Sequence, residues 1–325
     1  MECWGNNLYG QLGDGTYTAR STASVPVSGL SGATAIAAGY LHTCAIVAGG
    51  AVECWGANSF GQLGDGTNTA RSTAGVPVSS LSGATAIAAG SAHTCAIVAG
   101  GAVECWGDNS QDQLGNSTAN LNGSTAVPVS GLSGATAIAA GAGRTCAIVA
   151  DGAVECWGDN TVPRGDGTNT FSPTPVFVSG ISGASAIAVG KGGICATIAG
   201  GAVECWDYGH VINGSTPVLV SSLSGATAIA AGSAHTCAVV AGGAVECWGN
   251  NSYGQLGIGT TTNSSTPMAV SGLSGATAIA AGDLHTCVID ARGAVECGGS
   301  NSDGQLGDGT TANRPTPVPV LNAGS

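Results

Sequence analysis

Residues 42–56 read HTCAIVAGGAVECWG, and this stretch decides the fold because the chain repeats it along its length. Its second cysteine has counterparts at steps of 51, 51, 51, 49, 42 and 50 residues, namely Cys3, Cys54, Cys105, Cys156, Cys205, Cys247 and Cys297. Another cysteine lies ten positions before six of them, at Cys44, Cys95, Cys146, Cys195, Cys237 and Cys287. A period of this length is typical of a propeller, a solenoid or an array built from one small unit.

One copy of the repeat predicts four strands. Residues 33–39 and 42–47 are short apolar segments, Ala48-Gly49-Gly50 forms a tight turn, and residues 51–56 return as a third strand. A Gly-rich loop over 58–66 follows, and Val76-Pro77-Val78 starts a fourth strand at a sheet edge. No segment carries a helical pattern. Because four-stranded antiparallel blades repeated around an axis make a β-propeller, the sequence predicts an all-β propeller.

The strand count predicts six full blades and an N-terminal half blade. First strands occur six times, whereas third and fourth strands occur seven times. The predicted parts of one propeller domain are a half blade at 1–30, blades at 31–81, 82–132, 133–181, 224–273 and 274–325, and a short degenerate blade at 182–223. The half blade can be an appendage of a six-bladed ring, an incomplete seventh blade or a connection to another chain. We favour seven blade positions over six.

The hairpin also predicts the disulfide pairs. A three-residue turn centred on Gly49 places Cys44 opposite Cys54, at the roughly 4.5 Å Cα separation of a non-hydrogen-bonded antiparallel pair. We therefore predict bridges inside the blades and leave Cys3 unpaired or bonded to another chain. The predicted pairs are Cys44–Cys54, Cys95–Cys105, Cys146–Cys156, Cys195–Cys205, Cys237–Cys247 and Cys287–Cys297.

The regular cysteines indicate an oxidising compartment, so we predict an extracellular or cell-surface location. The reduced alternative is a set of buried thiols in a cytosolic core. No signal peptide precedes the first repeat motif, and we expect that a leader has been removed or that the chain is a fragment.

Composition argues against two kinds of partner. Seven Lys and Arg stand against 19 Asp and Glu, which gives a net charge of −12. Nucleic-acid binding needs clustered cations, and the basic residues of this chain are singletons. No apolar run approaches the roughly 18 residues of a membrane span. We expect neither nucleic-acid binding nor a membrane span.

The recurrent polar residues have structural explanations. Four histidines hold one repeat position, where separate blades keep them too far apart to share a zinc ion, and we expect each to connect a strand start to a neighbouring loop. They are His42, His93, His235 and His285. The Gly-Asp-Gly-Thr segments at 13–16, 64–67, 165–168 and 307–310 resemble calcium loops, but one Asp in each loop favours a turn. The glutamate before each third-strand cysteine is interpreted as architectural. We predict no catalytic residue, no metal and no cofactor.

The motifs HTCAIV, VECWG, NxxGQLGDGT, PV and AIAAG resemble the repeat of the regulator of chromosome condensation family, most closely its bacterial, cysteine-paired, α-tubulin-suppressor-like branch. The resemblance covers the whole chain and implies a propeller, usually of seven blades, with short loops at both rims. The eukaryotic founder is a nucleotide-exchange factor that docks on chromatin and a small GTPase. This acidic chain has neither a basic surface nor a long insertion for those roles. Other bacterial relatives are secreted inhibitors that clamp a partner, such as a β-lactamase, on one propeller face, which implies protein binding by analogy.

We therefore predict an extracellular, non-enzymatic scaffold that recognises a protein or surface ligand through rim loops. The loops around Tyr9, Phe60 and Tyr253 supply aromatic side chains of the kind that anchor interfaces. One alternative is a structural subunit that assembles head-to-tail, or as another homo-oligomer, into a filament or sheath through the half blade. A second alternative is an enzyme with an unidentified site in the propeller channel. The irregular stretches at 160–165, 191–194 and 206–210 mark a binding edge or drift in a tolerant loop.

Overall fold

The computed structural model describes residues 1–118, 121–160, 164–168, 172–207 and 215–321. These residues group into two compact units. The first comprises residues 1–3, 7–19 and 25–178, and the second comprises residues 4–6, 20–24 and 179–325. Of the described residues, none belongs to a helix long and apolar enough to cross a membrane.

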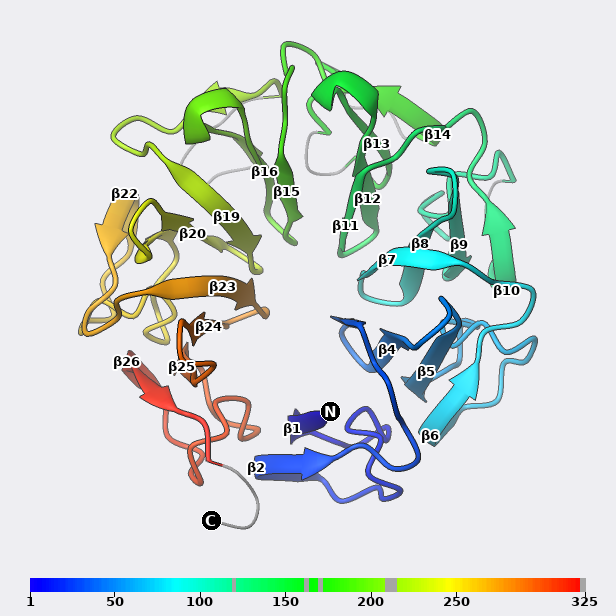
Figure 1. Cartoon of the computed structure of the whole chain (residues 1–325), viewed down its shortest axis with the longest axis horizontal. Helices are drawn as coiled ribbons and strands as arrows, with labels where there is room; N and C mark the ends of the chain where they lie inside the picture. The colour runs from blue at the N-terminus through cyan, green and yellow to red at the C-terminus, as the bar shows by residue number, and fades with distance from the viewer. Residues whose placement is uncertain (119–120, 161–163, 169–171, 208–214, 322–325) are drawn as a thin grey trace. The chain divides into compact units, whose positions relative to one another are not determined.

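The first unit contains three four-stranded antiparallel sheets, which we call blades one to three (Figure 1). Blade one comprises β3 (Ala35–Ala38), β4 (His42–Ile46), β5 (Val52–Ala57) and β6 (Arg71–Pro77). Blade two comprises β7 (Ala84–Ala89), β8 (His93–Val98), β9 (Val103–Gly107) and β10 (Gly123–Pro128). Blade three comprises β11 (Ala137–Gly141), β12 (Arg144–Ile148), β13 (Val154–Gly158) and β14 (Ser172–Phe177), with the short 3₁₀ helix η1 (Ala150–Gly152) between β12 and β13.

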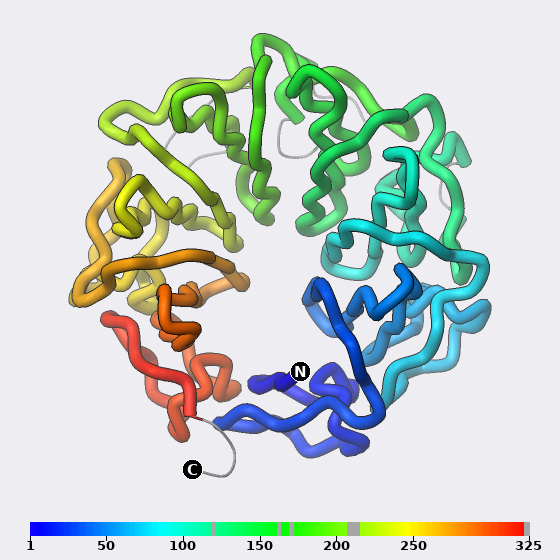
Figure 2. The backbone as a smooth tube through the Cα atoms, in the orientation of Figure 1, coloured from blue at the N-terminus to red at the C-terminus, as the bar shows by residue number. Residues whose placement is uncertain are grey.

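The second unit contains blades four to six, built in the same way. Blade four comprises β15 (Ala186–Val189), β16 (Gly193–Thr197), the 3₁₀ helix η2 (Ala199–Gly201), β17 (Val203–Asp207) and the short β18 (Val218–Leu219). Blade five comprises β19 (Ala226–Ala231), β20 (His235–Val240), β21 (Ala244–Gly249) and β22 (Ser264–Ala269). Blade six comprises β23 (Ala276–Ala281), β24 (His285–Asp290), β25 (Val295–Gly299) and β26 (Arg314–Pro319). In all six blades each strand pairs with the next one along the chain, so the backbone folds back and forth (Figure 2).

Successive blades within a unit pack face to face. Their first strands lie side by side, β3 with β7 and β7 with β11 in the first unit, and β15 with β19 and β19 with β23 in the second. Alanine-rich first strands allow this close approach. Cys44 and Val52 of blade one form one hydrophobic cluster with Ala96 and Trp106 of blade two, so the core lies between blades. The predicted all-β propeller fold, built from four-stranded antiparallel blades, is confirmed.

The chain begins with a two-stranded sheet of β1 (Glu2–Asn6) and β2 (Arg20–Pro26). In blades one and two, Trp106 Nε1 donates a hydrogen bond to the Gln62 carbonyl of the preceding blade at 3.0 Å. The strand pair makes this contact twice: Trp55 Nε1 donates to the Gln11 carbonyl (2.9 Å) in the first unit, and Trp4 Nε1 donates to the Gln305 carbonyl (3.0 Å) in the second. The pair is packed like the third and fourth strands of a full blade, in agreement with the predicted N-terminal half blade.

Each full blade contains one disulfide. Cys44 lies opposite Cys54 in the β4–β5 register, as the three-residue turn predicts. The other pairs repeat this geometry, with Cα atoms 4.0–4.1 Å apart in all six pairs and partners ten positions apart in the sequence: Cys95–Cys105, Cys146–Cys156, Cys195–Cys205, Cys237–Cys247 and Cys287–Cys297. Cys3 is a free thiol. The bridges therefore hold third strands to second strands and do not join blades.

Two local expectations were wrong. The fourth strand of blade one starts at Arg71, five residues earlier than predicted, and Pro77 ends it. The register between β5 and β6 shifts between Cys54 and Gly56, and this irregularity takes up the extra residues of an edge strand that pairs on one side only. The hairpin turns of blades three and four are short 3₁₀ helices, although the sequence shows no helical pattern.

Candidate binding surface

The meander places two connections at the same end of each blade. The turn after the first strand and the long loop after the third strand lie together, and in blade one the Ala57 amide donates to the Leu41 carbonyl at 2.8 Å. The hairpin turn at residues 48–50 lies at the opposite end, because β4 and β5 are antiparallel. We call the first end the loop end of a blade.

A buried asparagine organises each described long loop. The Asn58 side chain has no exposed surface; its Oδ1 accepts from the Leu63 amide (2.9 Å), and its Nδ2 donates to the Thr67 carbonyl (3.2 Å). Because a buried amide side chain needs partners, these bonds select one loop conformation. Asparagines at the same repeat position accept the equivalent amide bond: Asn7, Asn109, Asn160, Asn251 and Asn301. They were not among the predicted residues, although their recurrence in the loops was the available signal.

The three predicted aromatic residues lie at the tips of these loops. Tyr9 and Phe60 of the first unit are 39% and 43% exposed, and Tyr253 of the second unit is 42% exposed. The backbone amide of each donates to the Oε1 atom of the glutamine two residues later at 2.9 Å. The tips therefore hold their side chains in solvent on fixed turns.

Further exposed apolar side chains lie at the loop ends of the half blade and of blade one. Leu8 and Tyr17 belong to the same loop as Tyr9, and Tyr40 belongs to the turn before β4; they are 51%, 46% and 65% exposed. We call Leu8, Tyr9, Tyr17, Tyr40 and Phe60 the aromatic loop surface.

Arg71 of β6 supports this surface. Its Nη1 donates to the Leu8 carbonyl at 2.9 Å, and its guanidinium carbon lies 4.0 Å from the centre of the Tyr17 ring, a cation–π arrangement. Leu8, Tyr17 and Tyr40 were not among the predicted residues. Arg71 was not predicted either, because it reaches the half-blade loop from the following blade.

In each Gly-Asp-Gly-Thr segment the aspartate carboxylate accepts hydrogen bonds from the threonine of the same turn. Asp65 Oδ1 accepts from the Thr67 amide (2.9 Å) and the Thr67 hydroxyl (2.8 Å), and Asp14, Asp166 and Asp308 bond their threonines in the same way. Burial opposes ionisation of Asp308, but hydrogen bonds from Thr310 and Arg314 outweigh it and hold the pKa of this carboxyl below its usual value. In the described ranges no three His, Cys, Asp or Glu side chains are placed to hold a metal ion together.

The histidines connect neighbouring blades. His93 Nε2 lies 2.9 Å from Thr145 Oγ1, and that hydroxyl donates to the Gln113 carbonyl at 3.3 Å. Because the hydroxyl proton is used there, His93 must carry its own proton on Nε2. His42 with Thr94 and His235 with Thr286 repeat the 2.9 Å contact. The expected partner was a loop; the observed partner is a strand of the following blade.

Burial keeps these histidines neutral. It lowers the pKa of His42 to about 3, of His93 to about 4 and of His235 to about 3. The Nδ1 atom of each is buried without a hydrogen-bond partner. A glycine makes room for the ring, since a Cβ atom at Gly39 would lie 2.6 Å from His42 Nδ1. These imidazoles are therefore uncharged near neutral pH.

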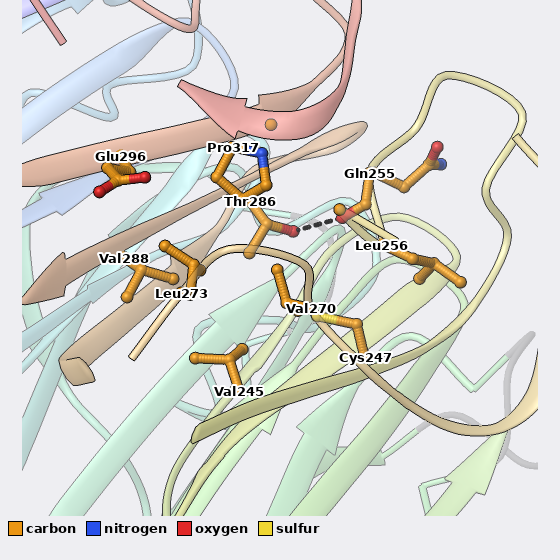
Figure 3. Close-up of a pocket in the computed structure, with 12 residues that line it drawn as sticks. Val245, Cys247, Gln255, Leu256, Val270, Leu273, Thr286, Val288, Glu296 and Pro317 are labelled. Carbon is orange, nitrogen blue, oxygen red and sulfur yellow. Dashed lines mark hydrogen bonds between the residues drawn. The ribbon is translucent and has the colours of Figure 1, made fainter. Parts of the chain in front are cut away.

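Two cavities of the second unit arise where the repeat lacks a large side chain. One, of about 10 Å³, lies beside Gly298, which stands where other blades have tryptophan; Gln255, Thr286 and Pro317 line it (Figure 3). The other, of about 20 Å³, lies beside Gly193, which stands where most blades have histidine. Ligand pockets usually enclose roughly 300 Å³ or more, so each cavity has room for about one water molecule.

Burial shifts the pKa values of two of the irregular and acidic positions. Arg144 replaces a histidine in blade three; burial lowers its pKa to about 10, and Asp159 opposes this shift. The third-strand glutamates of the six full blades are partly buried, and burial raises the pKa of Glu155. The irregular stretches were interpreted as either a binding edge or drift in a tolerant loop, and of these residues 161–163 and 208–210 lie outside the described residues.

Comparison with known families identifies the repeat. One model of the "Regulator of chromosome condensation (RCC1) repeat" matches residues 3–46, 50–97 and 243–289. A second model of the same repeat matches residues 33–62, 84–113, 135–162, 226–255 and 276–305. Together the two models cover more than half of the chain.

Among characterised proteins, the probable E3 ubiquitin-protein ligase HERC6 of Homo sapiens is 33% identical over 180 residues, which are 53% of this chain and 17% of that protein. The regulator of chromosome condensation of Drosophila melanogaster is 30% identical over 153 residues, 46% of this chain and 28% of that protein. The chain thus matches less than a third of either relative.

Among solved structures, Prp20p from Saccharomyces cerevisiae superposes with a TM-score of 0.89 at 18% identity and covers 100% of this chain and 86% of its own. That structure is reported with the binding of Prp20p to Gsp1p and histones. At this identity the likeness shows a shared fold.

Proposed function

Because the chain belongs to the regulator of chromosome condensation (RCC1) repeat family, whose propellers suggest protein-binding scaffolds, we propose that it is a non-enzymatic scaffold that recognises a protein through the aromatic loop surface. The observation that carries this proposal is the exposure of Leu8, Tyr9, Tyr17, Tyr40 and Phe60 at neighbouring loop ends. Exposed apolar side chains at loop ends are a common feature of interaction sites, and tyrosine is enriched among residues that dominate binding energy.

Preorganisation supports the same function. Gln11 and Gln62 fix the backbone at Tyr9 and Phe60, and Asn7 and Asn58 fix the loops below them. A partner therefore binds loops that are already ordered, which reduces the entropy lost on association.

The six intrablade disulfides suggest an oxidising, non-cytosolic setting, and we place the scaffold outside the cell or on its surface. The net charge of −12 favours encounter with a basic protein partner. Binding of Gsp1p and histones by Prp20p supports a protein-binding role for the fold, without transferring those partners. The proposal does not extend to ligase activity, since the match to HERC6 covers 17% of that protein.

Replacing both Tyr9→Ser and Phe60→Ser is expected to weaken binding of the partner at least thirtyfold, as roughly 1 kcal/mol or more is lost with each interface anchor. Wild-type and variant chains are immobilised, proteins captured from the extracellular medium are identified by mass spectrometry, and the affinity of each purified candidate is then measured.

Phe177→Ser is the matched control, because Phe177 is also an exposed aromatic of the first unit, 65% exposed, but lies on β14 of blade three. The affinity of this control variant for the partner is expected to equal that of the wild type. Equal affinity of the wild type and the Tyr9/Phe60 variant for every captured protein would contradict the proposed surface.

A further inference from the structure

Arg71 occupies a repeat position that three other blades fill with asparagine. In blade two the equivalent Asn122 closes its own loop, because its Oδ1 accepts from the Asn109 amide at 3.0 Å. Asparagines of blades five and six make the same bond: Asn263 and Asn313. Blade one closes its loop with the backbone, since the Ala70 carbonyl accepts from the Asn58 amide at 3.0 Å. The Arg71 side chain is therefore not needed to close the loop of its own blade.

Arg71 is held instead by the half-blade loop. Its Nη1 donates to the Leu8 carbonyl at 2.9 Å, and its guanidinium carbon lies 4.0 Å from the centre of the Tyr17 ring. The tip of that loop lies against the start of β6, because a Cβ atom at Gly10 would be 2.8 Å from the Ser72 carbonyl oxygen. All of these residues belong to the first unit. The guanidinium is thus fixed at the aromatic loop surface before a partner arrives.

The charge of Arg71 is not neutralised by the chain. Three other arginines form ion pairs with aspartates: Arg164, Arg292 and Arg314. In the part of the chain that the structure describes, no carboxylate lies within ion-pair distance of Arg71, whose side chain is exposed. A guanidinium carries five N–H donors, and the bond to Leu8 uses one of them. The others remain available to an acceptor on another molecule.

We propose that Arg71 binds a carboxylate of the protein partner, carried by an aspartate or glutamate that stands beside an apolar residue. The planar guanidinium matches a carboxylate with two parallel hydrogen bonds, and the neighbouring apolar side chain packs on Leu8 and Tyr17. Because the Leu8 carbonyl and the Tyr17 ring already hold the guanidinium, little side-chain freedom is lost on binding. Arg71 acts here as part of the aromatic loop surface, so the proposal rests on the proposed function.

The overall charge of the chain is compatible with this contact. The net charge of −12 acts on a partner as a whole, whereas Arg71 acts on one group in direct contact. A partner that is basic overall still meets Arg71 with a single acidic side chain. A nucleic acid is a poor occupant, since one arginine offers one phosphate contact and the net charge repels the remaining phosphates.

Selection of peptides tests the proposal without a known partner. A display library of random peptides is selected on the immobilised full chain, and the peptides kept are those that fail to bind the variant with Tyr9→Ser and Phe60→Ser. Each is synthesised with blocked termini, so that only side-chain carboxylates remain, together with a copy in which the amide replaces the acid. The ratio of the two dissociation constants is expected to be at least about tenfold in favour of the acid, a difference of about 1.4 kcal/mol.

Variants of Arg71 separate recognition of the carboxylate from support of the loop. Loss of loop support alone would weaken the acid and amide peptides alike and leave their ratio unchanged. Arg71→Gln is expected to reduce the ratio to about one, and Arg71→Lys, which keeps the charge without the planar fork, to about threefold. The matched control is Arg292→Gln, since Arg292 is also exposed but belongs to the second unit and pairs with Asp290. This control is expected to keep the wild-type ratio.

The outcomes distinguish Arg71 from the surface around it. Selected peptides that need Tyr9 and Phe60 but show a ratio near one, or a ratio that Arg71→Gln leaves unchanged, would overturn the carboxylate contact and leave the aromatic loop surface in place. A selection that yields no peptide dependent on Tyr9 and Phe60 would count against both.

Discussion

The free energy of unfolding is expected to fall steeply as the pH drops below about 6.5, because His42, His93 and His235 must stay neutral in the folded chain. Their folded-state pKa values, about 3, about 4 and about 3, lie below the 6.5 of an ordinary histidine. At pH values between the folded and unfolded pKa values, these histidines are protonated in the unfolded chain and neutral in the folded chain. Stability is therefore full above about pH 6.5, declines as the pH falls, and stops declining once the pH is below the folded pKa values.

The geometry explains why the histidines are not protonated in the folded chain. In His93, Nε2 already donates to Thr145, and a proton added to the buried Nδ1 would have no acceptor. Each histidine contributes about 1.4 kcal/mol per pH unit within this window, so these three change stability by roughly 4 kcal/mol per unit, and His285, whose pKa burial lowers to about 4, adds to this dependence. Asp166 and Asp308, whose pKa values lie below the usual 3.8, lose their contribution only at lower pH.

Urea unfolding followed by tryptophan fluorescence, at a series of pH values from about 7.5 to 4.5, measures this dependence. His93→Gln keeps a donor for Thr145 but cannot titrate. The variant is expected to be less stable near neutral pH, and its stability is expected to change with pH by about 1.4 kcal/mol per unit less than the wild type. An unchanged slope in His93→Gln would contradict the assignment of a buried neutral histidine.

Trp106→Ala is expected to lower the free energy of unfolding by about 3–5 kcal/mol. The indole has no exposed surface and packs in blade two against Leu63 and Val78 of blade one. Its Nε1 donates to the Gln62 carbonyl, and Gly64 is needed beside it, because a Cβ atom there would lie 2.9 Å from the ring. Truncation removes apolar contacts on both sides of the interface and leaves a cavity.

The matched control is Phe177→Ala, since Phe177 is 65% exposed and its loss is expected to change stability by no more than about 0.5 kcal/mol. Gly298→Ala is the converse test: the added methyl group meets its neighbours at ordinary contact distances of 3.4–3.6 Å beside the cavity of Figure 3, with an expected gain of up to about 1 kcal/mol. Urea unfolding at neutral pH measures all three. Similar losses for Trp106→Ala and Phe177→Ala would show that interfaces between blades do not hold the fold.

The parts of the structure that sequence predicts best are those within one hairpin. The turn Ala48-Gly49-Gly50 fixes the register of β4 and β5, and this register alone brings Cys44 opposite Cys54. Recurrence of the same pattern then indicates blades, because one unit cannot bury a core by itself.

The parts that sequence does not predict depend on the next blade. The threonine that pairs with His42 lies 52 residues away, and Arg71 lies 63 residues from the Leu8 carbonyl that it bonds. A pattern within one repeat gives no information about contacts one repeat apart. The early start of β6 depends on an irregular register with β5, which propensity does not specify. The aromatic loop surface was therefore only partly predicted, through Tyr9 and Phe60.

The central claim is that each blade is closed by its own disulfide and that blades are joined only by packing and hydrogen bonds. Peptide mapping of the unreduced protein tests this claim most directly. Alkylation in denaturant without reductant is expected to label Cys3 alone, and digestion is expected to yield six linked pairs, each joining cysteines ten residues apart. A peptide that links cysteines of two different blades, or alkylation of all 13 cysteines, would contradict this architecture.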